Sequence, residues 1–325
     1  SQELQDETLK NIGYEIVGKN YTAPFWRTDI HIREDIVEDI GRINGFDNIE
    51  PTLPRRYFNA VTASKTARLS DKAREILSAA GANEVLTYSF INSELLKKVG
   101  QNPANSYRII NAISPELQYC RQSLLPSLLT KAYMNIKVPF DKFVLFEINK
   151  VHQKSFGLTE EKVPVEQRKL ALVVADRKLQ SAAYYQAKYY AEQLLDRLNL
   201  SVKFVPLTDN DASNRPFEPK RSAQIIDAND ESVCYGVVGE LRTNVRKELK
   251  LPKFVAGFEL NLDLIAEYAS DVASYSPIAS GGDIERNVTL AVDNNLSFAE
   301  IAESFQQVLS QTGLRYKILP TGIYQ

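Results

Sequence analysis

Four carboxylates close to the only tryptophan of the chain are the residues of this sequence best placed to do chemistry. Asp35, Glu38 and Asp39 stand at positions i, i+3 and i+4, so a helix would present them next to one another. Asp29 lies upstream, at or before the start of that helix, and follows Trp26. The helix is predicted from an apolar stripe on its other side and a glycine that ends it: Ile36, Ile40, Ile43 and Gly45.

Two interpretations of these carboxylates compete. In the first they serve the helix, because acids favour a helix start and Asp35 with Glu38 imitates a capping box. Glu38 with Arg42 would then form an i,i+4 ion pair. In the second they bind a hard cation, because Mg²⁺ takes oxygen ligands and often binds through only one or two carboxylates. The spacing alone favours the first interpretation, since acid-rich helix starts are common.

Composition limits the classes of function. The 325 residues are 44% hydrophobic and 25% charged, which is typical of a globular protein with two or three domains. A net charge of −2 gives no sign of a nucleic-acid binder, so any RNA contact must rest on local patches. Cys120 and Cys234 lie far apart, which excludes a thiol-based zinc cluster and fits a reducing, cytoplasmic location. No apolar run approaches the ~20 residues that span a membrane, so we expect no membrane partner.

The residue order around the carboxylates is distinctive. It reads Pro24-Phe25-Trp26-Arg27-Thr28-Asp29-Ile30, then Asp35-Ile36-Val37-Glu38-Asp39-Ile40, Arg42-Ile43 and Gly45-Phe46-Asp47-Asn48-Ile49. This series resembles a segment of the bacterial phenylalanyl-tRNA synthetase beta chain family, where it belongs to a small winged-helix-like module. The resemblance implies that the family's four magnesium positions, shared with the alpha chain, fall on Asp29, Asp35, Glu38 and Asp39. Asp39 stands where the family usually has glutamate.

Further matches follow in the same order through nearly the whole chain. They lie at residues 84–90, 111–116, 121–129, 146–151, 217–223 and 236–241, and at the start of the final section, Glu285-Arg286-Asn287-Val288. The sequence departs from the family pattern at four places. It has Glu218 where the family has histidine, Lys220 in place of glycine, Arg242-Thr243 in place of His-Pro, and Asn287 in place of aspartate.

The resemblance implies an α+β chain of three parts. Residues 1–54 would be a partial winged-helix-like module, and residues 55–274 a class II synthetase-like, antiparallel-sheet domain that is catalytic-like but not catalytic. Residues 275–325 would be a partial ferredoxin-fold anticodon-binding domain, so the chain looks truncated at both ends. Hydrophobic periodicity predicts helices at 64–80, 181–199 and 298–311, and strands at 84–90, 109–110, 143–148, 170–174, 224–226, 233–238, 254–260, 287–292 and 316–319.

The resemblance also implies a function. The chain would be the beta subunit of a phenylalanine-tRNA ligase, an aminoacyl-tRNA synthetase that uses ATP to charge tRNA(Phe) with phenylalanine. Two alpha and two beta chains assemble in the family, and the alpha chain activates the amino acid. This chain is then a non-catalytic scaffold that binds the alpha subunit, shares Mg²⁺ with it, and meets tRNA(Phe) in the full assembly.

We expect no catalytic residue in this chain. A class II ATP site needs arginines that clamp phosphates, and Phe146-Glu147-Ile148 lacks the arginine expected on that strand. Gly236 and Gly239 do not form the glycine-rich run that ends in arginine. Neither His31 nor His152 has a nucleophile or metal ligand at a meaningful spacing.

Two features allow more than one interpretation. Arg121 is either a helix-start arginine paired with Glu116, or a retained pseudo-active-site residue or interface anchor. The helix at 181–199 carries a tyrosine-rich face, interpreted as core packing rather than base stacking, because no Lys/Arg cluster accompanies it in the sequence. Its members are Tyr184, Tyr185, Tyr189 and Tyr190.

Two other functions stay open. The first is a nucleic-acid-binding protein that uses the winged-helix-like module, although the helix from Asp35 to Asn44 presents acids that would repel phosphate. The second is a stand-alone synthetase paralogue, which phenylalanine-dependent ATP–pyrophosphate exchange by the isolated chain would reveal.

Overall fold

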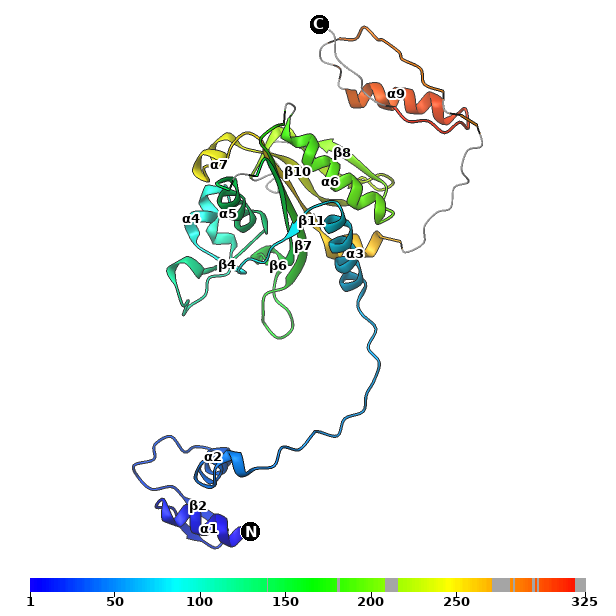
Figure 1. The fold of residues 1–325 in the computed structure, drawn as a ribbon. Helices are drawn as coiled ribbons and strands as arrows, with labels where there is room; N and C mark the ends of the chain where they lie inside the picture. Colours follow the sequence, from blue (N-terminus) through cyan, green and yellow to red (C-terminus); the bar gives the residue numbers. More distant parts are fainter. Residues whose placement is uncertain are drawn as a thin grey trace. The chain divides into compact units, whose positions relative to one another are not determined.

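The computed structural model describes residues 1–138, 140–179, 182–207, 216–270, 281–282, 284–293, 296 and 298–318. The chain divides into two compact units, Ser1–Asp71 and Lys72–Gln325 (Figure 1). The part of the first unit that precedes its extended segment, residues 1–49, is called here the smaller unit, and Lys72–Gln325 is called the larger unit. No helix in the described part of the chain is long and apolar enough to cross a membrane.

The smaller unit consists of two helices and a short hairpin. Helix α1 (Gln2–Asn11) leads through Gly13, whose φ of 95° reverses the chain, into β1 (Glu15–Val17) and β2 (Asn20–Thr22). Helix α2 (Arg33–Asn44) follows and packs on α1, and a 3₁₀ turn, η1 (Phe46–Asn48), closes the unit's regular structure. The indole of Trp26 lies so close to Gly13 that a Cβ there would come within 3.0 Å of the ring.

Residues 50–64 form no helix or strand and connect the smaller unit to α3 (Lys65–Ala79). Four large apolar side chains in this linker are at least 91% exposed: Leu53, Tyr57, Phe58 and Val61.

The larger unit is built on a seven-stranded mixed sheet in the order β3-β6-β7-β11-β10-β9-β8. The strands are β3 (Asn83–Glu84), β6 (Lys142–His152), β7 (Glu166–Asp176), β8 (Val202–Pro206), β9 (Phe217–Asp227), β10 (Cys234–Leu241) and β11 (Val255–Asn261). All neighbours are antiparallel except β3 and β6, which are parallel. A separate two-stranded sheet pairs β4 (Phe90–Ile91) with β5 (Tyr119–Cys120).

Helices cover both faces of this sheet, which explains why its central strands are apolar along most of their length. Helix α5 (Leu125–Ile136) packs on one face, where Val173 of β7 belongs to its hydrophobic cluster. Successive strand residues point to opposite faces, so Leu172 and Val174 face the other side. There α6 (Ala183–Arg197) packs against β7, β10 and β11 (Figure 1).

Glycines let the central strands and their side chains approach closely. Gly239 of β10 pairs with Gly257 of β11 in the ladder. A Cβ on Gly239 would lie 2.0 Å from Oγ of Ser222, and one on Gly257 would lie 2.4 Å from the carbonyl oxygen of Leu172. Part of the glycine pattern noted in the sequence is therefore a packing requirement of the sheet.

The remaining described helices are α4 (Ser93–Lys98), α7 (Thr243–Glu248), α8 (Leu262–Tyr268) and α9 (Phe298–Ser310), with 3₁₀ turns at Pro103–Asn105, Pro115–Leu117 and Lys154–Phe156.

The predicted helices at 64–80, 181–199 and 298–311 are confirmed by α3, α6 and α9, and most central strands by longer ones. The strand predicted at 84–90 keeps only its two ends. Residues 109–110 form no strand, and Ile110 lies in a turn and is fully exposed. Residues 287–292 and 316–318 form no strand, and Leu319 lies outside the described residues. The mixed α/β architecture thus holds, whereas the strands expected of a partial ferredoxin domain do not form in the described residues.

Candidate functional site

The carboxylate of Asp35 caps the start of α2. Its Oδ2 accepts hydrogen bonds from the backbone N–H groups of His31 at 2.8 Å and Ile32 at 3.0 Å. These bonds hold the pKa of Asp35 below its ordinary value. One oxygen of Asp35 therefore serves the helix start, as the first interpretation expects, but only as an acceptor of backbone N–H groups, because the Ile32 side chain has no acceptor to complete a capping box. The predicted pairing of Asp35 with Glu38 is wrong, because the helix begins at Arg33, three residues earlier than that pairing requires.

Asp39 is the buried centre of the smaller unit's ionic network, with 1% of its surface exposed. Its Oδ2 accepts from the Tyr14 hydroxyl at 2.8 Å and from Nη1 of Arg27 at 2.7 Å, while its Oδ1 accepts from Nη2 of Arg42 at 2.6 Å. Burial opposes ionisation of Asp39, but the hydrogen bonds from Arg27, Tyr14 and Arg42 outweigh it and lower the pKa. The predicted pair of Arg42 with Glu38 is wrong, because Arg42 turns to the buried charge instead.

Asp29 is held by the same arginine. Nε of Arg27 donates to Oδ1 of Asp29 at 2.9 Å and Nη2 donates to Oδ2 at 2.7 Å, which is a bidentate contact. Hydrogen bonds from Arg27 lower the pKa of Asp29 to about 2. Arg27 therefore bridges Asp29 and Asp39, two of the four carboxylates singled out in the sequence.

Glu38 differs from the other three. It is exposed on α2, and no hydrogen bond or ion pair joins it to any residue that the structure describes. Oδ1 of Asp35 likewise has no partner within the described ranges, since both bonds to that side chain use Oδ2. The four carboxylates do not form a closed cage: among the described residues no group of three or more His, Cys, Asp or Glu could hold a metal ion.

In the larger unit, Arg121 forms a fully buried ion pair with Glu147 of β6. Nη1 of Arg121 donates to Oε1 of Glu147 at 3.0 Å and to Oγ1 of Thr87 at 2.7 Å, and the Thr87 hydroxyl donates to Oε2 of Glu147 at 2.7 Å. The predicted partner Glu116 is wrong, because Arg121 follows strand β5 rather than starting a helix. Its complete burial within its own unit also excludes an exposed interface anchor.

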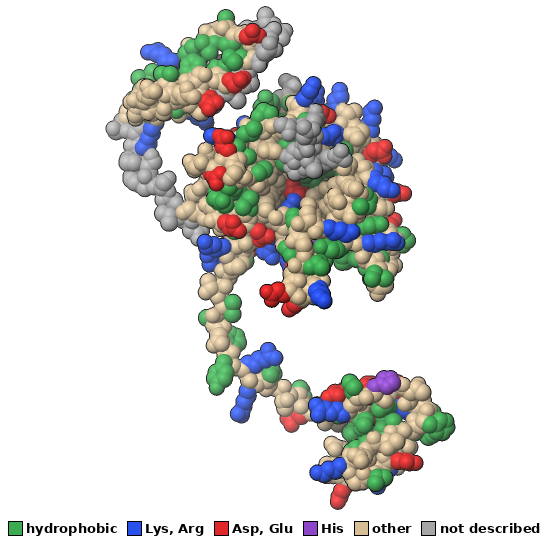
Figure 2. Space-filling model, turned by 180° about the vertical axis from the view of Figure 1, so that it is seen from behind, with side chains coloured by type: hydrophobic (Ala, Val, Ile, Leu, Met, Phe, Trp, Pro, Cys, Tyr) green, Lys and Arg blue, Asp and Glu red, His purple; other side chains and the backbone are tan. Residues whose placement is uncertain are grey.

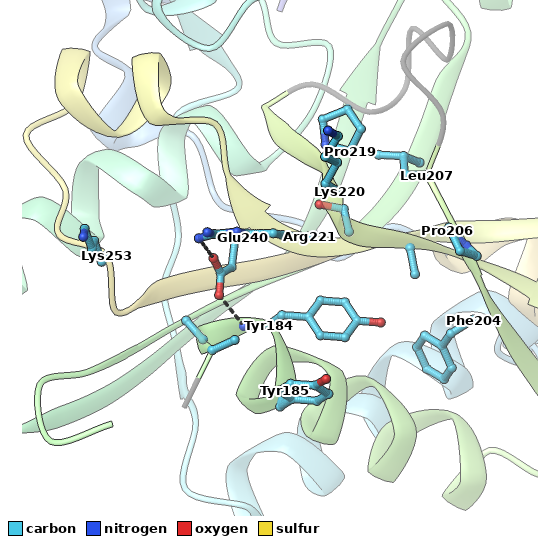
Figure 3. A pocket seen from close by; sticks show the side chains of 14 residues that line it. Tyr184, Tyr185, Phe204, Pro206, Leu207, Pro219, Lys220, Arg221, Glu240 and Lys253 are labelled. Carbon is cyan, nitrogen blue, oxygen red and sulfur yellow. Dashed lines mark hydrogen bonds and ion pairs between the residues drawn. The ribbon is translucent and has the colours of Figure 1, made fainter. Parts of the chain in front are cut away.

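A pocket of about 860 Å³ lies where β8 and β9 meet the start of α6 (Figure 3). It is lined by aromatic residues, Tyr184, Tyr185 and Phe204, and by charged residues, Lys220, Arg221, Glu240 and Lys253. Burial raises the pKa of Tyr184 to about 12, so its phenol stays protonated. The core-packing prediction holds for Tyr190 but is wrong for Tyr185 and Tyr189, which are 61% and 55% exposed. Sequence reasoning missed this pocket because its cations lie far from the tyrosines along the chain.

Two family models match the chain. One, described as "Phenylalanyl tRNA synthetase beta chain CLM domain", matches residues 49–262, and another, described as "tRNA synthetase B5 domain", matches residues 1–46.

Curated relatives are similar over most of the chain. The phenylalanine–tRNA ligase beta subunit of Carboxydothermus hydrogenoformans is 26% identical over 309 residues, covering 91% of this chain and 38% of the relative. That of Staphylococcus aureus is 28% identical over 290 residues, covering 86% of this chain and 34% of the relative. The chain therefore spans 34–38% of the length of these relatives.

A solved structure is similar in fold to part of the chain. The pyrrolysyl tRNA synthetase PylSc of Desulfitobacterium hafniense matches with a TM-score of 0.50 and 14% identity, covering 62% of this chain and 68% of that one. At this identity the likeness is one of fold alone, and the fold is class II synthetase-like.

Proposed function

This chain belongs to the phenylalanyl-tRNA synthetase beta chain family, and we propose that it works as a non-catalytic scaffold of a phenylalanine-tRNA ligase. The family match over residues 49–262 carries the proposal. The buried Arg121–Glu147 pair supports the proposal. Glu147 lies on the strand where a catalytic arginine would be expected, and its carboxylate is already paired with Arg121 and hydrogen-bonded to Thr87 inside the fold. A side chain so engaged holds strands together and offers nothing to a substrate.

The partner in this proposal is the alpha subunit, with two alpha and two beta chains in the assembly. The assembly would charge tRNA(Phe) with phenylalanine at the expense of ATP, in the cytoplasm. Residues 1–54 would form the winged-helix-like module, residues 55–274 the catalytic-like module, and residues 275–325 part of the anticodon-binding domain.

Magnesium shared with the alpha subunit would be held at Asp29, Asp35, Glu38 and Asp39. The donor set suits a hard cation, and Mg²⁺ commonly keeps several waters and uses only one or two protein carboxylates. Glu38 and the unengaged oxygen of Asp35 are the groups free to ligate, while Arg27 ties Asp29 and Asp39 into the fold. Water and oxygen atoms of the alpha subunit would complete the coordination of the ion. The ion would then supply positive charge between the two chains.

The nucleic-acid-binding alternative is not favoured. The exposed side of α2 carries Glu34 and Glu38, which repel phosphate. On the face of the larger unit seen in Figure 2, acidic and basic side chains are interspersed rather than gathered into a broad basic surface.

The test is assembly with the cognate alpha subunit, followed by size-exclusion chromatography with light scattering in Mg²⁺. We expect a stable complex that Glu38→Ala weakens by about tenfold, as is usual when a metal-site group is lost. Glu34→Ala, on the same helix turn and outside the four positions, is the matched control and should assemble normally.

Three outcomes would overturn parts of the proposal. Failure of the folded chain to bind the alpha subunit would remove the scaffold function. Phenylalanine-dependent ATP–pyrophosphate exchange by the isolated chain would show that the chain is catalytic. Equal assembly by Glu38→Ala and Glu34→Ala would leave the scaffold but remove the magnesium assignment.

A further inference from the structure

The pocket at the start of α6 is not used by the scaffold function, yet two motif segments of the sequence converge on it. Residues 217–223 contribute Lys220 and Arg221, and residues 236–241 contribute Glu240. Its volume of about 860 Å³ falls in the ~300–1,000 Å³ range of small-molecule sites. The site is therefore large enough for a small organic ligand, and its lining indicates which kind.

The charged side chains of the pocket leave two cations available. Glu240 accepts from Nη1 of Arg221 at 3.1 Å and from the backbone N–H of Tyr184 at 3.2 Å, so its charge is already balanced (Figure 3). Lys220 and Lys253 are exposed, and neither forms a hydrogen bond or ion pair with any residue in the described part of the chain. Lys220 also stands where the family pattern has glycine, so this cation is a departure of the present sequence.

The aromatic side chains of the pocket offer faces for stacking. The rings of Tyr184 and Tyr185 lie 5.3 Å apart at 75°, and the Tyr184 side chain points between the Arg221–Glu240 pair and Phe204 (Figure 3). Tyr185 is 61% exposed, which is a large exposed area for an aromatic residue. Lys188 lies over the ring of Phe204 at 4.6 Å, so Tyr184 and Tyr185 are the rings best placed to receive a planar group.

We propose that this pocket binds a nucleotide, with its phosphate at Lys220 and its base against Tyr184 and Tyr185. An acidic peptide would use the lysine but not the rings, and a neutral aromatic compound would use the rings but not the lysine. A nucleotide uses both, and aromatic faces beside basic side chains are how proteins hold single nucleotides of unpaired strands. The inference goes beyond the scaffold function, because subunit assembly does not require it.

The nucleotide has two possible sources with the same chemistry. It is either a free mononucleotide or one residue of a single-stranded RNA. This site could not be predicted from the sequence, because Lys220, Arg221 and Lys253 join the tyrosines only when β9 and the segment before β11 fold beside α6.

The experiment measures binding of two fluorescent probes to the full chain, a labelled AMP and a labelled short oligoadenylate. Three variants are compared with the parent: Lys220→Glu, Tyr185→Ala, and the control Lys98→Glu, an exposed lysine of α4 that does not line the pocket. We expect Lys220→Glu and Tyr185→Ala each to weaken binding by about tenfold, which matches the loss of one stacking or phosphate contact. Lys98→Glu should bind as the parent does, and circular dichroism of each variant should match the parent.

The probe arms decide the source, and each result bears on the proposal. Binding of AMP alone identifies a free nucleotide, and binding of the oligoadenylate with stronger salt dependence identifies single-stranded RNA. Absence of binding by both probes overturns the proposal. Equal loss in Lys98→Glu, or full displacement of the probes by polyglutamate at matched charge, also overturns it, because either result would show general charge attraction only.

Discussion

Asp39 of the smaller unit and Glu147 of the larger unit are both buried carboxylates, and they are neutralised in different ways. Asp39 in the smaller unit is buried, but its arginines reach the surface, with 24% of the Arg27 side chain and 59% of the Arg42 side chain exposed. Glu147 in the larger unit and its partner Arg121 are both 0% exposed. One charge network thus extends to the surface, whereas the other is enclosed in the core.

This difference separates an architectural pair from a network that supports a surface. The Arg121–Glu147 pair joins β6 to the segment around Thr87 and has no route to solvent or ligand. The Asp39 network instead fixes Arg27, which orients Asp29 at the surface of the same unit. Position within the unit, rather than residue type, decides which carboxylate can meet a partner.

Breaking the enclosed pair should produce the largest effect. Glu147→Ala leaves the Arg121 guanidinium charged, buried and unpaired, and we expect a loss of about 3–5 kcal/mol in the free energy of unfolding. Urea denaturation followed by far-UV circular dichroism measures this loss, because the larger unit holds the seven-stranded sheet. The double variant Arg121→Met/Glu147→Leu should recover much of it, and failure to recover would show that the pair's charge is not the cause.

The open network should cost less to break. Asp39→Ala removes the common acceptor of Tyr14, Arg27 and Arg42, but water can reach both arginines. We expect a loss of about 2 kcal/mol, in the range for charged hydrogen bonds. Trp26, the only tryptophan of the chain, reports unfolding of the smaller unit by fluorescence. A loss as large as that of Glu147→Ala would contradict the distinction between the two networks.

Acid should weaken the smaller unit through the same network. The pKa values of Asp29 and Asp39 are lowered in the folded chain, so each stabilises the fold above the unfolded pKa of about 4. This stabilisation is lost as the pH falls through the folded values, about 2 for Asp29. Denaturation followed by Trp26 fluorescence should be constant from neutral pH to about pH 5 and weaken below about pH 4. Asp39→Ala should flatten this decline, and an unchanged decline would assign it to other carboxylates.

The smallest effect on stability is expected at Glu38. Glu38→Ala removes an exposed side chain that has no hydrogen bond or ion pair with the described residues, so the urea midpoint should not move. The same variant is the one proposed to weaken assembly in Mg²⁺. A measurable loss of stability would show that Glu38 supports its own fold, and the assembly result would then need a structural explanation.

The sequence predicted well what depends on neighbouring residues. Apolar periodicity located α3, α6 and α9, and it placed Asp35, Glu38 and Asp39 on α2. The partners of charged residues were predicted poorly, because these partners lie far away in the sequence and are brought together only by the fold. Arg121 meets Glu147 through the course of β6, and Asp39 meets Tyr14 and Arg27 through the turn that precedes α2. Nearest-neighbour rules instead paired Arg121 with Glu116 and Arg42 with Glu38.

The linker of residues 50–64 determines where a protease can cut. Arg55 and Arg56 offer trypsin sites, and Tyr57 and Phe58, at 98% and 105% exposure, offer chymotrypsin sites on backbone that forms no helix or strand. A brief digestion should therefore release the smaller unit as an intact fragment that carries Trp26 and all four carboxylates. A partner chain that covers the linker would slow this cleavage. The digestion rate therefore measures directly whether the exposed apolar side chains of the linker, Leu53, Tyr57, Phe58 and Val61, are buried on assembly.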